Sequence, residues 1–209
     1  MKLRNLLTFI LVGMCLFVGG LSVQAQSNQA DTKEDETNVD TQLYLILGTN
    51  QDVVDSKLPS SLDGVVKQLR ATLPFKNYRL AATLINRSRN EGKLELSWVG
   101  APLTSTPSAA QLMTRSSFRV RHIKLVRGSE GQPMVQMTGF VFNAQIPILA
   151  NAAAVAAANP EPPVFSYEGT TLSTDISMRE GEPVIVGTLN AGPSGDAVIL
   201  VVSVKRTAK

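Results

Sequence analysis

The spacing of apolar residues predicts one helix near the start of the chain and strands after it. Between residues 60 and 73 the apolar positions repeat at helical spacing, so they share one face. This stripe consists of Leu62, Val65, Val66, Leu69 and Leu73. Ser60 and Asp63 have the spacing of a capping box at the start, and Pro74 ends the segment. We therefore expect an amphipathic helix that packs on a sheet.

Most of the remaining chain shows the two-residue alternation or the short apolar runs of β-strands. The expected strands are residues 42–47, 78–87, 93–99, 117–126, 133–146, 170–178, 184–189 and 197–204. Two hairpins are expected, one across Asn90-Glu91-Gly92 and one across residues 128–131. The final strand is apolar on both faces for part of its length, which places it at the centre of a sheet. The pattern predicts an α+β, mostly β fold: an antiparallel sheet or sandwich covered by one amphipathic helix.

The first 25 residues have the layout of a secretory signal peptide. Two basic residues precede an apolar run from Leu6 to Val23, and a small residue, Ala25, stands before the expected cleavage site. We expect export, with the periplasm or cell envelope as the destination. The alternative is that residues 5–23 remain uncleaved and anchor the protein in the inner membrane, because about 18 apolar residues approach spanning length.

After this segment the chain divides into a tether and a domain. Residues 26–41 are polar and acidic and contain no aromatic side chain, so we expect them to be disordered. Residues 42–209 are expected to form one β-rich α+β domain. A stretch rich in Ala and Pro, residues 149–163, interrupts the strand pattern and is expected to form a hinge or a long crossover.

Charge and cysteine content narrow the function classes. The net charge of +3 includes two basic residues of the signal peptide, so the exported protein carries only +1. So small an excess gives no general attraction to phosphate, and nucleic acid is not an expected partner. The single Cys, Cys15, lies within the signal peptide, so a hydrophobic core rather than a disulfide is expected to hold the exported protein together.

One strand concentrates positive charge and is the only candidate binding surface. Its basic residues are Arg115, Arg119, Arg121, Lys124 and Arg127. Such a patch could hold anionic lipid headgroups or an acidic partner, and the alternative is a solvated sheet face. Phe118 is the only aromatic residue nearby, which disfavours the stacking that binds single-stranded nucleic acid.

The sequence shows no catalytic or metal-binding constellation. His122 is the only His, and the exported chain has no Cys, so a nucleophilic triad or a zinc site lacks its usual residues. Glu180 and Glu182 flank a Gly in a turn and are expected at a solvated hairpin tip. We expect neither enzymatic activity nor a cofactor.

The carboxy-terminal strands resemble a hairpin of bacterial secretins. Residues 176–189 contain Arg-Glu-Gly-Glu-Pro-Val-Ile-Val-Gly-Thr-Leu and precede the apolar strand 197–204. Secretins form the outer-membrane channels of type II and type III secretion and of pilus machines, and they carry a similar turn and strand, with a second Gly where this chain has Thr188. The helix and strand from Leu62 to Leu84 are similar to the small ring-building domains of the same proteins. The resemblance implies a component of an envelope assembly and carries over no catalytic residue.

Together these features favour an exported, non-enzymatic envelope protein that acts through protein–protein contacts, as an accessory of a secretion or pilus-like assembly. Its expected partner is another envelope protein. The alternative is an exported module that binds lipid or another small amphiphile, to which the basic strand and four Met residues point. These are Met113, Met134, Met137 and Met178, for which gap-filling in the core is the competing explanation. A hydrolase with an unfamiliar site is the third alternative.

Overall fold

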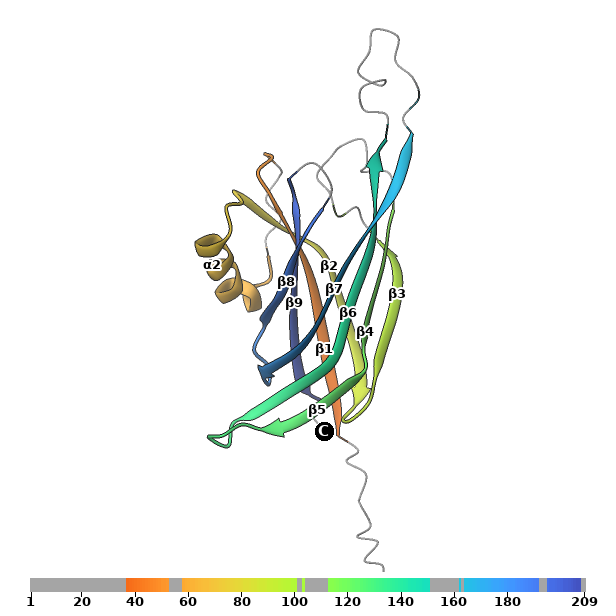
Figure 1. Ribbon diagram of the computed structural model, residues 1–209. Coiled ribbons are helices and arrows are strands. Elements are labelled where there is room, and N and C mark those ends of the chain that lie inside the picture. Colours follow the sequence, from red (N-terminus) through yellow and green to blue (C-terminus); the bar gives the residue numbers. More distant parts are fainter. Residues whose placement is uncertain are drawn as a thin grey trace, which may run out of the picture. The chain divides into compact units, whose positions relative to one another are not determined.

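Two antiparallel sheets face each other across one hydrophobic core, and a single helix covers the outer face of one of them (Figure 1). The computed structural model describes residues 37–52, 58–100, 103, 113–150, 162, 164–191 and 195–207. The signal peptide predicted for residues 1–25 lies outside these ranges. The predicted α+β, mostly β architecture with one amphipathic helix is confirmed.

Sheet A contains four strands in the order β2-β1-β9-β8. Their bounds are Asn38–Thr49 for β1, Asn77–Arg89 for β2, Val184–Asn190 for β8 and Ala197–Arg206 for β9. β9 lies between β1 and β8, and its first eight residues are all buried. The central position predicted for this strand is therefore confirmed.

Sheet B is built around the long strand β6. Its strands are β3 (Leu94–Gly100), β4 (Thr114–Val120), β5 (His122–Arg127), β6 (Pro133–Leu149) and β7 (Phe165–Arg179). One edge of β6 pairs with β7, and the other edge pairs with β5 and then with β4. β3 completes the sheet beside β4.

The strand predicted for residues 117–126 is in fact two strands that part at Arg121. The Arg121 N–H donates to the carbonyl of Thr138, and the following residue of β6, Gly139, has a positive φ of 64°. The register between β6 and β7 also shifts between Met137 and Phe140. A bulge of this kind bends a strand locally, and alternation of polar and apolar residues does not reveal it.

Helix α2 (Asp63–Thr72) follows a short 3-10 turn, Ser60–Leu62, and packs on the outer face of sheet A. Val65 and Leu69 of the predicted stripe are buried there. The Tyr78 hydroxyl donates to the carbonyl of Leu69 at 3.1 Å, and the same carbonyl accepts a hydrogen bond from the Leu73 N–H. Burial raises the pKa of Tyr78. The predicted capping box does not form: the 3-10 turn occupies its position, and no side chain caps either helical segment.

The hairpin predicted across Asn90-Glu91-Gly92 is wrong, because β2 joins sheet A and β3 joins sheet B. The backbone groups of this turn bond to another strand. The Glu91 N–H donates to the carbonyl of Ile123 at 2.7 Å, and the Ile123 N–H donates to the carbonyl of Gly92 at 2.9 Å. These bonds hold the start of β3 beside β5 and carry the chain from one sheet to the other.

Two predicted segment boundaries fall inside strands. β1 begins at Asn38, within the segment expected to be a disordered tether, and the residues from Val39 onward pair with both β2 and β9. At the predicted hinge, β6 continues to Leu149, where it pairs with Phe165 of β7. Residues 151–161 and 163 of that segment lie outside the described residues.

Close packing joins β7 and β8 across the two sheets. Gly187 of β8 faces Leu172 of β7 so closely that a Cβ at this position would overlap the Leu172 side chain. The intervening turn is fastened to β9, because the Glu180 carboxylate accepts a hydrogen bond from the Arg206 N–H and pairs with its guanidinium at 3.1 Å. The side chain of Glu180 is only 16% exposed, so its predicted place at a solvated hairpin tip is wrong.

Gly187→Val is expected to lower the free energy of unfolding by roughly 1–3 kcal/mol, because the added side chain must displace Leu172. Urea denaturation of the purified protein measures this loss. Gly169→Val is the matched control, since a Cβ there meets no atom within 4 Å. Adding Leu172→Ala should recover part of the loss, because the two residues share one space. Equal effects of the two Gly substitutions would show that the contact does not constrain the fold.

Candidate functional site

Two surfaces of the described residues are candidates for binding a ligand or a partner. Within them, no group of three or more His, Cys, Asp and Glu side chains is placed to hold a metal ion. The same residues include no helix that is long and apolar enough to cross a bilayer. The two candidate surfaces are the side of the sandwich between β2 and β3 and the outer face of sheet B.

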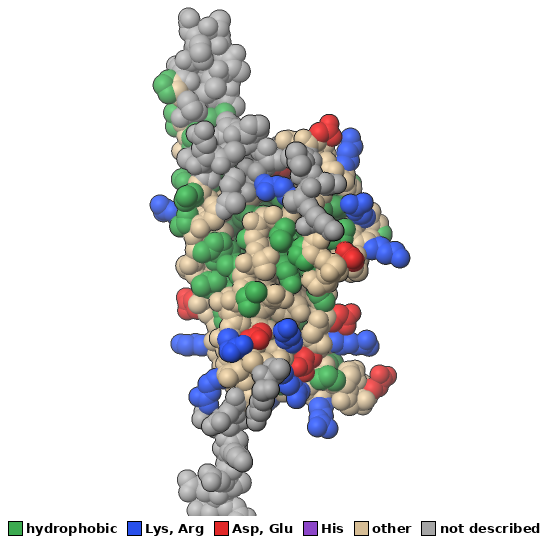
Figure 2. All heavy atoms as spheres, turned by 180° about the vertical axis from the view of Figure 1, so that it is seen from behind, with side chains coloured by type: hydrophobic (Ala, Val, Ile, Leu, Met, Phe, Trp, Pro, Cys, Tyr) green, Lys and Arg blue, Asp and Glu red, His purple; other side chains and the backbone are tan. Residues whose placement is uncertain are grey.

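The β2–β3 side is the side of the sandwich that is bordered by β2 and β3. β2 and β3 are the end strands of their sheets, and among the described residues each pairs with a strand on one side only. Side chains from both strands pack against the core but stay partly exposed: Ala81, Ala82, Leu84, Leu96 and Trp98. Figure 2 shows the molecule from behind, and hydrophobic side chains lie near the middle of the surface in that view.

Two exposed apolar residues and a cross-strand ion pair flank this strip. Ile85 is 65% exposed and Val99 is 58% exposed. Towards the end of β2, Arg87 donates two hydrogen bonds to Asp40, which lies directly opposite on β1, at 2.8 and 3.3 Å. The hydrogen bond from Arg87 is the main reason that the pKa of Asp40 lies below its ordinary value. The apolar part of the β2–β3 side therefore ends near the ion pair between Arg87 and Asp40.

Three buried polar atoms beside this strip have no hydrogen-bond partner among the described residues: Thr41 Oγ1, Asn86 Nδ2 and Ser88 Oγ. Thr41 of β1 lies directly opposite Asn86 of β2, and its side chain is fully buried. Buried polar groups are almost always satisfied in folded proteins, so such a group points to missing contacts. This end of the β1–β2 ladder is therefore stabilised less well than the rest of the core.

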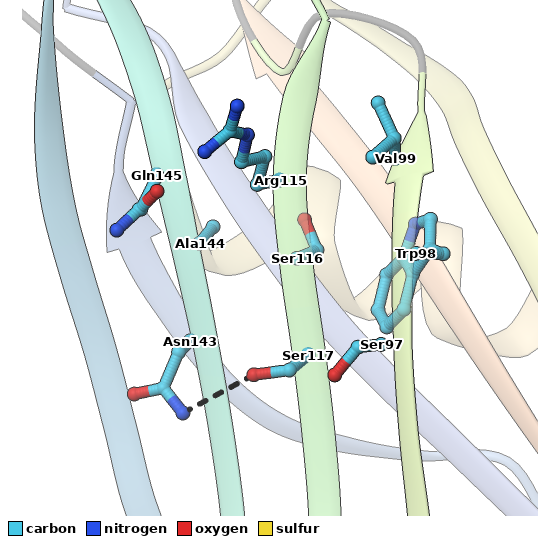
Figure 3. Close-up of a pocket in the computed structure, with 9 residues that line it drawn as sticks. All are labelled: Ser97, Trp98, Val99, Arg115, Ser116, Ser117, Asn143, Ala144 and Gln145. Atoms are coloured by element: carbon cyan, nitrogen blue, oxygen red, sulfur yellow. Dashed lines mark hydrogen bonds between the residues drawn. The ribbon is translucent and has the colours of Figure 1, made fainter.

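The outer face of sheet B carries an open depression of about 380 Å³ (Figure 3). Its polar lining is Ser97 from β3, Arg115, Ser116 and Ser117 from β4, and Asn143 and Gln145 from β6; its apolar lining is Trp98, Val99 and Ala144. Arg115 is the only charged side chain in the lining. Its guanidinium lies 5.9 Å from the ring centroid of Tyr167 on β7. The sequence reasoning missed Ser97, Ser117, Asn143 and Gln145, because isolated polar residues in alternating strands look like any solvated face.

The predicted basic patch is a line rather than a cluster. Arg115, Arg119, Arg121, Lys124 and Arg127 are all exposed and follow one another along β4 and β5. One extended strand over residues 115–127 would span roughly 40 Å at about 3.3 Å per residue, and the break at Arg121 makes the line shorter than this. The Lys124 ammonium pairs with Glu91 at 3.1 Å, and Glu95 lies directly opposite Arg119 in the β3–β4 ladder. Arg115 alone of the five lines the depression.

The other residues that the sequence singled out take separate positions. Met137 and Met178 are buried in the core, as gap-filling predicts, whereas Met113 is 64% exposed. His122 is partly buried in β5, opposite Thr138 of β6. The structure does not bring these residues together in one site.

Thr41→Val is expected to stabilise the protein by about 1 kcal/mol, because it keeps the side-chain shape and removes a buried hydroxyl that has no partner. Thr49→Val is the matched control. Thr49 is equally buried, but its hydroxyl accepts a hydrogen bond from the Gln51 N–H, so this substitution should destabilise. Denaturation curves measure both effects, and a loss of stability in Thr41→Val would show that its hydroxyl is satisfied in solution.

Arg87→Ala is expected to raise the pKa of Asp40 towards its ordinary value of 3.8. The pair contributes stability above the unfolded-state pKa, and this contribution is lost as the pH falls through the lower folded-state pKa. The stability lost in the variant should therefore be small at neutral pH, because Arg87 is more than half exposed, and should vanish in acid. An NMR titration of Asp40 measures the shift, and Arg87→Lys is the control that keeps the charge. An unchanged pKa would contradict the assignment.

Solved structures of secretins resemble this fold. The secretin InvG of the Salmonella SPI-1 type III secretion injectisome matches with a TM-score of 0.35 and 12% identity, over 83% of this chain and 65% of that chain. The secretin complex with its pilotin from ETEC, AspS–GspD, matches with a TM-score of 0.40 and 9% identity, over 86% and 51%. The V. cholerae type IV competence pilus secretin PilQ matches with a TM-score of 0.33 and 11% identity, over 83% and 58%.

No protein-family model and no curated protein matches the chain. The chain spans about half to two thirds of the length of these secretin chains. With TM-scores of 0.40 or lower, the matches carry no conclusion about activity or partners. The solved structures that match are secretins, the family that the carboxy-terminal sequence resembles.

Proposed function

We propose that this protein is a non-enzymatic component of the bacterial cell envelope that works by contact with a protein partner, as an accessory of a secretion or pilus-like assembly. The observation that carries the proposal is the β2–β3 side, where two end strands border a strip of partly exposed apolar side chains. The predicted export signal in residues 1–25 and the secretin-like sequence in residues 176–204 support the envelope setting.

The end strands supply the contact. An end strand presents a row of backbone N–H and C=O groups that can pair with a strand from another chain. β2 is 13 residues long, which is long for an end strand. Its central part, from Ala81 to Ile85, carries no charged side chain, whereas Arg87 near its end opposes indiscriminate pairing. A partner strand would therefore engage the central part of β2.

The same contact accounts for the incomplete burial on this side. A partner strand beside β2 would cover Ile85 and the partly exposed Leu84, Leu96 and Trp98. Burial of apolar surface stabilises such a complex by about 25 cal/mol per Å² before the costs of association. It would also bring backbone groups close to Asn86 and Ser88, whose buried polar atoms have no partner within the described chain.

Site-specific photo-crosslinking in the native host tests the proposal. The photoreactive residue benzoylphenylalanine is placed at Ile85 of the full chain, and irradiated cells are fractionated. We expect a crosslinked product of defined mass in the envelope fraction, because Ile85 lies within the proposed contact. Mass spectrometry identifies the partner, and a product of twice the chain mass would identify it as a second copy.

The matched control places the same residue at Ser173, which is exposed on the outer face of β7 and away from β2 and β3. This variant should give no comparable product. Ile85→Lys in a tagged chain should reduce co-purification of the identified partner, while Ser173→Lys should not. The proposal fails if positions 85 and 173 give the same products.

A further inference from the structure

We propose that the outer face of sheet B binds an acidic glycan, a sugar chain whose rings carry carboxylate groups. This face shares Trp98 and Val99 of β3 with the β2–β3 side, but the proposal rests on polar groups of β4, β6 and β7 and does not require a protein partner on β2. It rests on three features at or beside the depression in Figure 3: a polar row across the sheet, a fixed amide within that row, and the Arg115 guanidinium, which has no salt bridge among the described residues and lies near the ring of Tyr167.

The polar row crosses four neighbouring strands in direct register. Ser97 of β3 lies opposite Ser117 of β4, Ser117 lies opposite Asn143 of β6, and Asn143 lies opposite Thr171 of β7. Ser97, Asn143 and Thr171 are exposed, and Ser117 is partly exposed. With strands about 4.8 Å apart, the row extends roughly 14 Å, enough for more than one sugar ring. Hydroxyl and amide groups at regular intervals match the repeated hydroxyls of a sugar chain.

Hydrogen bonds within the row fix the orientation of its amide. The Thr171 hydroxyl donates to Asn143 Oδ1 at 2.8 Å, and Asn143 Nδ2 lies 3.5 Å from Ser117 Oγ. An Asn amide has two N–H donors and an oxygen with two lone pairs, so it retains one donor and one acceptor site. A ligand hydroxyl can use both without reorganising the side chain, which lowers the entropy lost on binding.

Arg115 supplies the charge. It lies in the adjacent row, between Val99 and Gln145, and no carboxylate within the described part of the chain forms a salt bridge with it. The guanidinium contact with the Tyr167 ring holds it beside the depression. Guanidinium groups bind carboxylates through two parallel hydrogen bonds. The ligand is therefore expected to carry a carboxylate as well as hydroxyls.

The surface of β7 beside Arg115 has room for a sugar ring. Gly169 lies directly opposite Gln145, and a Cβ there would meet no atom within 4 Å. Tyr167, two residues away on the same strand, is 48% exposed and presents an apolar ring with a polar tip. The C–H groups of a sugar ring can pack against such a surface while its hydroxyls reach the polar row.

The observations favour a glycan over a membrane surface. Polybasic membrane binding uses clusters of several Lys and Arg residues, whereas the depression has one. The remaining lining groups are neutral hydroxyls and amides together with the apolar side chains of Trp98, Val99 and Ala144. The polar groups suit the hydroxyls of a sugar, and the apolar groups suit its C–H faces.

Isothermal titration calorimetry of the purified full chain with tetragalacturonic acid tests the proposal. Its fully methyl-esterified form is the matched neutral ligand. We expect saturable binding of the acid and at least roughly tenfold weaker binding of the ester, since a hydrogen-bonded ion pair is worth about 1.5–3 kcal/mol. Arg115→Gln should weaken binding of the acid by a similar factor, and Asn143→Ala should weaken binding of both forms.

Arg127→Gln is the control for general charge attraction, because it removes the same charge from the same line of residues outside the depression. Its affinity for the acid should equal that of the unmodified protein. Circular dichroism checks that each variant is folded, and Asn143→Ala tests the site independently of Arg115. The proposal is overturned by absence of saturable binding, by equal affinity for acid and ester, or by equal losses in the two Arg variants. Binding to phosphatidylglycerol vesicles without binding to tetragalacturonate would likewise overturn it.

Discussion

The pairing of β1 with β9 is the interaction on which the rest of the structure depends. Both strands are buried on both faces through most of their length. On one face, residues such as Leu43 and Leu200 meet sheet B, and on the other, residues such as Ile46 and Ile199 meet α2. The two cores therefore share one ladder of backbone hydrogen bonds. A change in its register by one residue would exchange the two sets of side chains and dismantle both cores at once.

The two sides of the sandwich differ in how completely their residues are packed and hydrogen-bonded. Between β7 and β8, the absence of a side chain at Gly187 lets the strands approach, and Glu180 fastens their turn to Arg206. Between β2 and β3, apolar side chains stay partly exposed, and nearby polar groups are buried without partners. Natural proteins accept such imperfect packing where a surface serves a function. The β7–β8 side therefore stabilises the fold, whereas the β2–β3 side is available for contact with a partner.

Neither proposed surface requires chemistry at a reactive group. The β2–β3 side offers backbone hydrogen bonds and apolar area, whereas the depression on the outer face of sheet B offers hydroxyls, amides and one guanidinium beside apolar side chains. The two surfaces meet at β3, where Trp98 and Val99 border both.

The sequence by itself determined which segments form strands, the one helix, and the central place of residues 197–204, because these follow from local periodicity and burial on both faces. Only the tertiary structure decided that β2 and β3 part at Gly92, that the strand around Arg121 breaks, and that β1 begins at Asn38. The candidate sites were beyond the sequence for the same reason. Ser97, Ser117, Asn143 and Thr171 are far apart along the chain, and only the pairing of β3, β4, β6 and β7 brings them into one row.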